Sequence, residues 1–528
     1  MMKRVLFVAL VLLIAASLFT GCGKNAKTAG VEFILNNQTE PQSLDPTQIQ
    51  GVPEDRLWTA LFEGLVASNP ETNKAIPGVA EKWERNADGS VITFYLRKNA
   101  KWSDGTPINA KTFVDSWLYY LSPETAAVYA YMPASVIKGA TEYNAGNGPA
   151  SGVGIRAVDD YTFEVTLIGP VPYAVDMMTH YSFGPLPLHV MKKLGSEWTK
   201  PGNFVGNGPF TLESWTPQEK ITAVPNETYW NKKNVHLSRV TFLAIENDTT
   251  AYNKYKNGEI DWIPSIPVSL IDEISLDPNF HSAPFLTSYY YILNVNNPVL
   301  KDVRVRQALC YSIDRIELVE KVLKGGQIPS GAFVPEMAGY TPAEGFTLDI
   351  AKARSLLSDA GYPDGKGFPK FTVIYNTSEN HKKIAEWVQQ QWKNNLNIDI
   401  ELQNMEWGSF LDKRQSNDFD ISRSGWNSDY QDPSNFLDLL RKDSGNNDGR
   451  YSNPAYDALL DKAAQMQDGA ERNKILREAE MLGVKQDAAV IPFYIYTTQN
   501  MIDLNKWEGW YPNAADKHPL VGFKLKDK

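Results

Sequence analysis

One stretch of the chain, residues 371–404, constrains the fold more than any other because its apolar pattern changes period twice. Phe371–Asn376 (FTVIYN) predicts a strand, and Asn397–Asn404 (NIDIELQN) alternates apolar and polar residues as a second strand would. Between them, Ser378 can cap a helix. The apolar face of that helix carries Ile384, Trp387, Val388 and Trp392. A strand–helix–strand unit of this length is a crossover, so we expect two parallel strands and a mixed α/β fold.

The rest of the chain alternates short strands and amphipathic helices, without a repeat or a low-complexity tract. Helices are expected at Leu57–Leu65 and Ala110–Leu121. Strands are expected at Val31–Asn36, Val91–Arg97, Tyr161–Leu167, Ile260–Ile263, Tyr289–Val295 and Asp418–Ser422. Ligands gather beyond the carboxyl ends of parallel strands, which points to His381, Trp407 and the stretch Arg423–Asp429.

The first 22 residues have the layout of a secretory signal. Lys3 and Arg4 precede an apolar run, Val5–Ala16, that is too short to span a bilayer. The segment ends Leu18-Phe19-Thr20-Gly21-Cys22, which resembles a lipobox in which Cys22 is acylated and becomes the new N-terminus. We therefore expect lipid attachment at Cys22, with ordinary signal cleavage as the alternative. Lipid chains would anchor the protein to the outer face of the cell membrane.

Composition limits the class of protein. The chain has 528 residues and a net charge of −10 without a basic stripe, which argues against a nucleic-acid partner. Its length suits three to four domain-sized units. The second cysteine, Cys310, lies among apolar residues at helical spacing and is expected to be a buried core thiol. No disulfide forms within the chain if Cys22 carries lipid.

Motifs for catalysis are missing. The sequence contains no G-x-S-x-G, no Walker loop and no H-E-x-x-H, and its six histidines show no pair at the helical spacing of metal ligands. Gly152–Ala157 fits G-x-G-x-x-A, but it follows a loop and runs into a strand, so it is interpreted as a turn. We predict a protein that is not an enzyme and has neither a cofactor nor a metal.

A group of motifs resembles the family-5 solute-binding proteins of ABC importers. The most specific is Ala80–Trp117, with its W-S-D-G-x-P block. Others are Asp45-Pro46, Gly51–Glu54, Leu61–Leu65, Gly206–Phe210, Asn226–Trp230, Asp302–Leu309, Tyr375–Lys383 and Gly425–Leu437. The last two resemble the oligopeptide-binding (Opp-type) branch.

The resemblance implies a class II periplasmic-binding-protein-like bilobal fold, α/β, with an extra third domain. After the signal peptide, residues 1–22, lobe I would comprise 24–62, 184–285 and 498–528. The extra domain would be 63–183, and lobe II would be 286–497. The chain would cross twice between the lobes, which close over an extended peptide.

The resemblance also implies a set of peptide-binding residues. Asp429 would receive the α-ammonium, and Arg423 and His381, as cations at different depths, would receive the α-carboxylate of peptides of different lengths. His381 has independent support, since a helix capped by Ser378 would place it in the first turn, where free amides favour an anion. Residues matched to the pocket lining, for which core packing is the alternative, are Trp407, Arg414, Trp426, Tyr496 and Tyr129.

Main-chain pairing with the peptide as an added strand is implied at Gly425, Asn427 and Val52. Two positions depart from the family. Gln50 stands where close relatives carry a glutamate, and Leu323, beside Lys324, stands where a lysine suits longer peptides. Binding of longer peptides is therefore in question.

The function predicted is capture of short oligopeptides, about three to five residues long, for delivery to the permease subunits of an ABC importer. The protein is expected to act as a monomer held by its lipid. The alternatives are a narrower ligand (a dipeptide, a murein tripeptide or a peptide pheromone), a nickel chelate, or a cell-wall peptidase with an unrecognised catalytic group.

Overall fold

The computed structural model describes residues 30–337 and 339–526. The predicted signal segment and Cys22 lie outside the described residues. Among the described residues, no helix has both the length and the apolar character needed to cross a bilayer. Cys310 is a free, fully buried thiol in α10 (Val303–Tyr311), as its apolar neighbours predicted.

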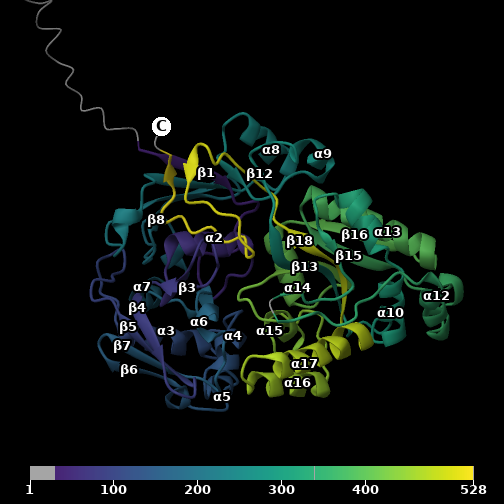
Figure 1. The fold of residues 1–528 in the computed structure, drawn as a ribbon, viewed down its shortest axis with the longest axis horizontal. Helices are drawn as coiled ribbons and strands as arrows, with labels where there is room; N and C mark the ends of the chain where they lie inside the picture. The colour runs from purple at the N-terminus through teal and green to yellow at the C-terminus, as the bar shows by residue number, and fades with distance from the viewer. Residues whose placement is uncertain (1–29, 338, 527–528) are drawn as a thin grey trace, which may run out of the picture.

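A seven-stranded mixed sheet forms the part of the molecule that we call the first lobe (Figure 1). Its order is β12-β19-β11-β1-β10-β9-β8. The strands are β1 (Glu32–Asn36), β8 (Phe210–Thr216), β9 (Lys220–Pro225), β10 (Arg239–Leu243), β11 (Trp262–Ile263), β12 (Phe280–His281) and β19 (Asn500–Ile502). The helices here are α2 (Val52–Leu61), α7 (Leu188–Leu194), α8 (Asp248–Lys256) and α9 (Ile271–Ile274). Three separate stretches of chain therefore build one sheet.

A six-stranded sheet forms the second lobe, in the order β14-β18-β13-β17-β15-β16. Its strands are β13 (Pro284–Leu293), β14 (Ile328–Pro329), β15 (Phe371–Asn376), β16 (Ile400–Met405), β17 (Ile421–Asn427) and β18 (Val490–Thr497). Besides α10, its helices are α11 (Arg315–Glu317), α12 (Ile350–Asp359), α13 (Glu379–Leu396), α14 (Trp407–Gln415), α15 (Ser434–Leu437), α16 (Pro454–Ala464) and α17 (Ala470–Glu480). Figure 1 shows α10, α12 and α13 on the outer side of this sheet and α16 and α17 beneath it.

A four-stranded antiparallel sheet, β4-β5-β7-β6, forms a third domain. Its strands are β4 (Ala80–Arg85), β5 (Val91–Leu96), β6 (Ile155–Asp159) and β7 (Thr162–Thr166). Its helices are α3 (Ala110–Leu121), α4 (Tyr131–Val136), α5 (Ala140–Asn144) and α6 (Ala174–Met177), and it also holds the short strand pair of β2 (Val66–Ser68) with β3 (Ala75–Pro77). Trp117 of α3 packs edge-on against Phe163 of β7, with ring centroids 5.1 Å apart. This packing joins helix to sheet. A second short pair, β20 (Trp507–Glu508) with β21 (Lys524–Leu525), belongs to the first lobe, where the Trp507 ring contacts Phe33 of β1.

The chain crosses twice between the two large sheets. One crossing runs from β12 to β13 and the other from β18 to β19. The crossings lie side by side, because Pro284 pairs with Thr497 and the Thr498 amide donates to the Ala283 carbonyl at 2.9 Å. The molecule is thus a mixed α/β, bilobal fold with a third domain, as the resemblance implied.

The predicted crossover is confirmed. β15 and β16 are parallel in a register that places Phe371 opposite Ile400. The Ser378 side chain accepts from the His381 amide, which fixes the start of α13, and Asn397 ends the helix in a left-handed conformation. On the predicted apolar face, Trp392 is fully buried and its indole N–H donates to the Leu309 carbonyl. The change of apolar period in the sequence therefore predicted this strand–helix–strand unit correctly.

Several predicted boundaries are wrong. The helix expected at Leu57–Leu65 is α2, which starts at Val52 because a proline at its start and two acids in its first turn favour initiation there. It ends before Phe62, whose backbone is extended. The strand expected near residues 418–422 is β17, which is longer and begins at Ile421.

Candidate binding cavity

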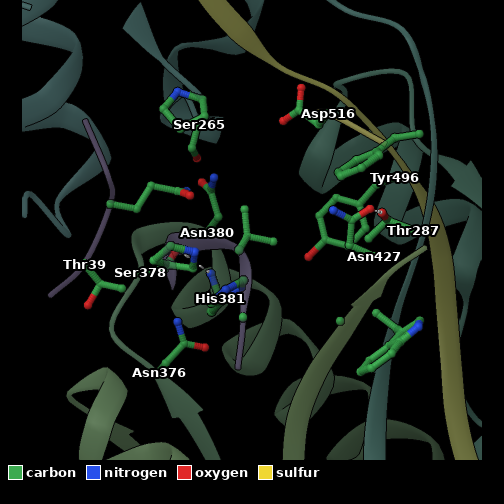
Figure 2. Close-up of a pocket in the computed structure, with 18 of the residues that line it drawn as sticks. Thr39, Ser265, Thr287, Asn376, Ser378, Asn380, His381, Asn427, Tyr496 and Asp516 are labelled. Carbon is green, nitrogen blue, oxygen red and sulfur yellow. Dashed lines mark hydrogen bonds between the residues drawn. The ribbon is translucent and has the colours of Figure 1, made fainter. Parts of the chain in front are cut away.

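A cavity of about 320 Å³ lies between the two lobes and also touches the third domain. This volume falls in the range of small-ligand sites. All eleven residues proposed from the sequence line it: Val52, Tyr129, His381, Trp407, Arg414, Arg423, Gly425, Trp426, Asn427, Asp429 and Tyr496. Figure 2 shows Asn376, Ser378 and His381 on one side of the cavity and Thr287, Asn427 and Tyr496 on the other. The structure therefore brings together residues from segments far apart in the sequence.

The two lobes contact each other around this cavity. Glu379, in the first turn of α13, accepts from the Asn247 side chain at 2.5 Å and from the Thr249 hydroxyl at 2.8 Å, both at the start of α8. The indole N–H of Trp407 donates to Glu54 of α2 at 3.2 Å. These contacts join the lobes, so the structure describes a closed arrangement of the two lobes.

One end of the cavity is cationic because of Arg423, which lies on β17. Its guanidinium donates to the Tyr496 hydroxyl at 3.0 Å and to the Asn376 side chain at 3.2 Å, and it lies 5.1 Å from the Tyr289 ring. Within the described part of the chain, no carboxylate forms an ion pair with it, and its Nε has no hydrogen-bond partner. A guanidinium held in this way by neutral groups retains its full charge for an anionic ligand.

His381 differs from the cation expected at this position. Burial lowers the pKa of His381 well below its ordinary value, and the neighbouring Arg423 charge lowers that pKa further. The imidazole is therefore neutral at pH 7, and its buried Nδ1 has no partner among the described residues. It offers a hydrogen bond, whereas the full positive charge at this end belongs to Arg423.

The opposite end of the cavity is anionic because of Asp429, just beyond β17. Its side chain is 14% exposed, and burial raises the pKa of Asp429 to about 7, with Lys517 lowering it and Asp55 raising it. Lys517 itself lies 3.5 Å from Asp55. His180 is 3.7 Å away, but burial lowers the pKa of this histidine well below its usual range, so it does not neutralise Asp429. Two carboxylates therefore share one ammonium, and the balance favours another cation.

Between the charged ends, β17 presents an unpaired edge. Ser428 donates to Leu286 and Asn294 donates to Asp420, so in the β13–β17 pairing the even-numbered residues of β17 bond to β13. Because successive residues point to opposite sides, the N–H and C=O groups of Gly425 and Asn427 face away from β13. There β15 pairs only with the first two residues of β17, so these groups face the cavity. This edge can accept an added strand.

Aromatic side chains form the walls of the cavity. The Trp426 ring stacks on Tyr129 at 6.2 Å, and its indole N–H donates to Asn435 at 2.9 Å. Arg414 also lines the cavity but is ion-paired with Asp448 at 2.5 Å, so its charge is already neutralised. Core packing and cavity lining are therefore not alternatives here, since these side chains do both.

The structure also places Val52, and Lys324 beside Leu323. Val52 is the first residue of α2 and does not lie in a strand, so its amide can contact a ligand only as a free amide of a helix start. Lys324 does not line the cavity, and its ammonium pairs with Asp272 at 2.7 Å. Gln50 and Leu323, the positions that depart from the family, both line the cavity. Sequence reasoning did not find Lys517 and Asp55. They act on Asp429 from segments far away in the sequence, and no motif surrounds either of them.

Two lobes joined by paired crossings, with a charged cavity between them, define a ligand-binding protein of the bilobal class. The family described as bacterial extracellular solute-binding proteins, family 5 Middle, matches residues 74–448. The chain belongs to this family. No cluster of three or more acidic, histidine or cysteine side chains suited to a metal ion occurs within residues 30–337 and 339–526.

Known relatives match nearly the whole chain. The periplasmic oligopeptide-binding protein OppA of Salmonella typhimurium is 39% identical over 98% of this chain and 96% of its own length. The crystal structure of Haemophilus influenzae OppA in complex with RPPGFSPFR is 34% identical, with a TM-score of 0.89 over 94% of this chain and 99% of that chain.

A third relative is known in two structures that differ in their likeness to this chain. The Escherichia coli murein tripeptide binding protein MppA is 37% identical, with a TM-score of 0.90 over 94% of this chain and 99% of that chain. Its unliganded open form covers 94% and 98% of the two chains but gives a TM-score of only 0.62. The arrangement of the lobes described here therefore differs from that open form.

Proposed function

We propose that this protein captures short peptides between its two lobes and delivers them to the permease of an ABC importer. The observation that carries the proposal is the pattern of charge along the cavity. Asp429, which shares the Lys517 ammonium with Asp55, lies at one end, the Arg423 guanidinium lies at the other without an ion pair, and an open strand edge runs between them. A peptide matches this pattern, because its ammonium and its carboxylate lie at opposite ends of a backbone that can pair with a strand edge.

Each residue has a role in this proposal. Asp429 receives the α-ammonium, and Arg423 receives the α-carboxylate with a hydrogen bond from His381. Gly425 and Asn427 pair with the peptide backbone by β-augmentation. The side chains of Trp407, Trp426, Tyr129 and Tyr496, together with the aliphatic part of Arg414, form walls against which peptide side chains of many kinds can lie. Binding at both ends with permissive walls supports peptides of about three to five residues.

The three-domain division is part of the same proposal. We infer a lobe I of residues 24–62, 184–285 and 498–528, an extra domain of 63–183 and a lobe II of 286–497. The composition of the sheets supports it, because every strand of the seven-stranded sheet falls within the lobe I segments. Strand β13 begins two residues before the proposed boundary, in the crossing itself.

We further infer that the mature protein is a monomeric lipoprotein attached through Cys22. The lipobox-like segment supports this inference. Cys22→Ser should leave the protein in the soluble fraction of cells, whereas the native protein should partition with membranes and incorporate labelled palmitate. A native protein that is soluble and carries no lipid would contradict the anchor without affecting the peptide proposal.

The decisive test of function is native mass spectrometry of the purified protein, which should show mass additions of short peptides. Isothermal titration calorimetry with tri-alanine should then give saturable binding after mild unfolding removes the carried ligand. A protein that cleaves added peptide would instead be an enzyme, and appearance of shorter products would contradict the proposal.

A further inference from the structure

A second acidic group lines the cavity, away from Asp429, and the proposed function does not use it. We call it the acidic subsite, and it consists of Thr39, Glu246, Asp248 and Ser265. In Figure 2 Thr39 and Ser265 lie on the same side of the cavity as Ser378 and His381. The subsite therefore borders the end of the cavity assigned above to the peptide carboxylate.

Asp248 is the most constrained member of the acidic subsite. It is only 4% exposed, and its Oδ2 has no hydrogen-bond partner among the described residues. Burial raises the pKa of Asp248 to about 7, with the Ser265 hydroxyl lowering that pKa and Glu379 raising it. A buried carboxylate with a free oxygen is costly to the fold, so its presence calls for a specific reason.

Glu246 adds a second carboxylate of the same kind. It accepts a hydrogen bond from the Thr39 hydroxyl at 3.0 Å. Burial raises the pKa of Glu246, with Thr39 lowering it and Glu406 raising it. No lysine or arginine within residues 30–337 and 339–526 forms an ion pair with Glu246 or Asp248. The acidic subsite thus lacks a cation from the protein.

Helix capping does not explain Asp248. The start of α8 is already capped by Asn247, whose side chain accepts from the Thr250 amide at 2.7 Å. An acid in the first turn gains only a small stabilisation from the helix dipole even when it is partly buried, which does not offset the desolvation of a carboxylate whose second oxygen has no partner. The burial of Asp248 beside the cavity is therefore not explained by helix capping.

The position of the subsite identifies which part of a ligand would reach it. Glu379, whose charge raises the pKa of Asp248, lies two residues before His381 in the first turn of α13. We propose that the acidic subsite receives the cationic side chain of the last residue of a bound peptide, so that peptides ending in lysine or another diamino acid are favoured. This inference rests on the proposed peptide binding and names a substrate class within it.

Calorimetry with matched tripeptides tests the inference on the native protein. Ala-Ala-Lys should bind at least tenfold more tightly than Ala-Ala-norleucine, which has a similar chain length without the charge. The same exchange at the first or second position should change affinity less than threefold. Equal affinities at the last position, or a lysine preference at another position, would overturn the inference. Failure of all six peptides to bind would contradict the proposed function itself.

A variant then assigns the preference to the subsite. Asp248→Asn should abolish the preference for Ala-Ala-Lys over Ala-Ala-norleucine, and a thermal melting curve like that of the native protein would show that the variant is folded. Glu386→Gln, on an exposed part of α13, serves as the control and should retain the preference. Retention of the full preference in both Asp248→Asn and Glu246→Gln would refute the assignment.

Discussion

Blocking the peptide's amino group should be the most informative perturbation, because it removes the one cation that Asp429 is proposed to receive. Burial raises the pKa of Asp429 from 3.8 to about 7. That shift corresponds to roughly 4 kcal/mol of disfavoured charge in the closed lobes. Removing one partner of a buried ion pair costs about 3–5 kcal/mol, so N-acetylation of tri-alanine should weaken binding by at least about 100-fold at pH 8.

The acetylation effect should depend on pH with a definite sign. Asp429 is taken to be hydrated, with an ordinary pKa, while the lobes are apart. Closure over an acetylated peptide then raises its pKa to about 7, so protonation favours closure and the affinity rises as the pH falls below 7. The gain from pH 7 to pH 5 should be on the order of 50-fold. The unmodified peptide keeps Asp429 ionised and should show no such gain.

Calorimetry on a double-mutant cycle measures this directly. The cycle pairs native protein and Asp429→Asn with free and acetylated tri-alanine, and Asp399→Asn, at an exposed position between α13 and β16, serves as the control. Asp429→Asn should weaken the free peptide by about 100-fold and the acetylated peptide by much less. A coupling energy below about 0.5 kcal/mol would refute the ammonium assignment.

Three further predictions address other parts of the molecule. Arg423→Gln should weaken peptides with a free carboxylate by about 10- to 100-fold while leaving C-amidated peptides nearly unchanged, and calorimetry that shows equal losses for both would contradict the role of Arg423. Gly425→Val should lower affinity by at least tenfold, because a Cβ added there would lie 3.2 Å from the Arg423 guanidinium and 3.5 Å from the Tyr496 hydroxyl, and calorimetry that shows unchanged peptide affinity would count against close approach of a peptide at Gly425. Trp392→Ala should lower the free energy of unfolding by about 3–5 kcal/mol in urea denaturation, since the side chain is fully buried under α13, and a loss below about 1 kcal/mol would show that this packing is not needed.

The residue pattern alone predicted the crossover unit, whereas the residues that line the cavity were implied by the resemblance to the family. A change of apolar period, together with Ser378 as a cap, specified β15, α13 and β16 to within a few residues. These signals are local, because hydrophobic period and capping act within one or two turns. The start of α2 at Val52 is marked by Pro53 and by the acids Glu54 and Asp55, which precede the apolar period that begins at Leu57.

Charge states were not predictable from the sequence, because they depend on burial and on distant neighbours. The sequence makes His381 a cation, whereas burial makes it neutral. Arg414 was predicted only to line the cavity, and its ion pair with Asp448, 34 positions along the chain, carried no local signal. Lys517 and Asp248 carried no local signal at all, since their importance arises from what they face across the cavity.

The charges at the two ends of the cavity explain how ligand binding can be coupled to closure, because two carboxylates share one ammonium at one end and Arg423 has no acidic partner among the described residues at the other. Closure without a peptide would bury Asp429 beside Asp55, and Arg423 beside neutral groups, each at the cost of a desolvated charge. A zwitterionic peptide removes both costs at once, whereas a ligand with one charged end removes only one. The closed state is therefore favoured selectively by peptides with both ends free, because a ligand shifts such an equilibrium by its difference in affinity for the two states. Direct contacts between the lobes, such as the hydrogen bond from Thr249 to Glu379, then need to contribute little to the stability of the closed state, because the charges in the cavity make closure depend on the ligand.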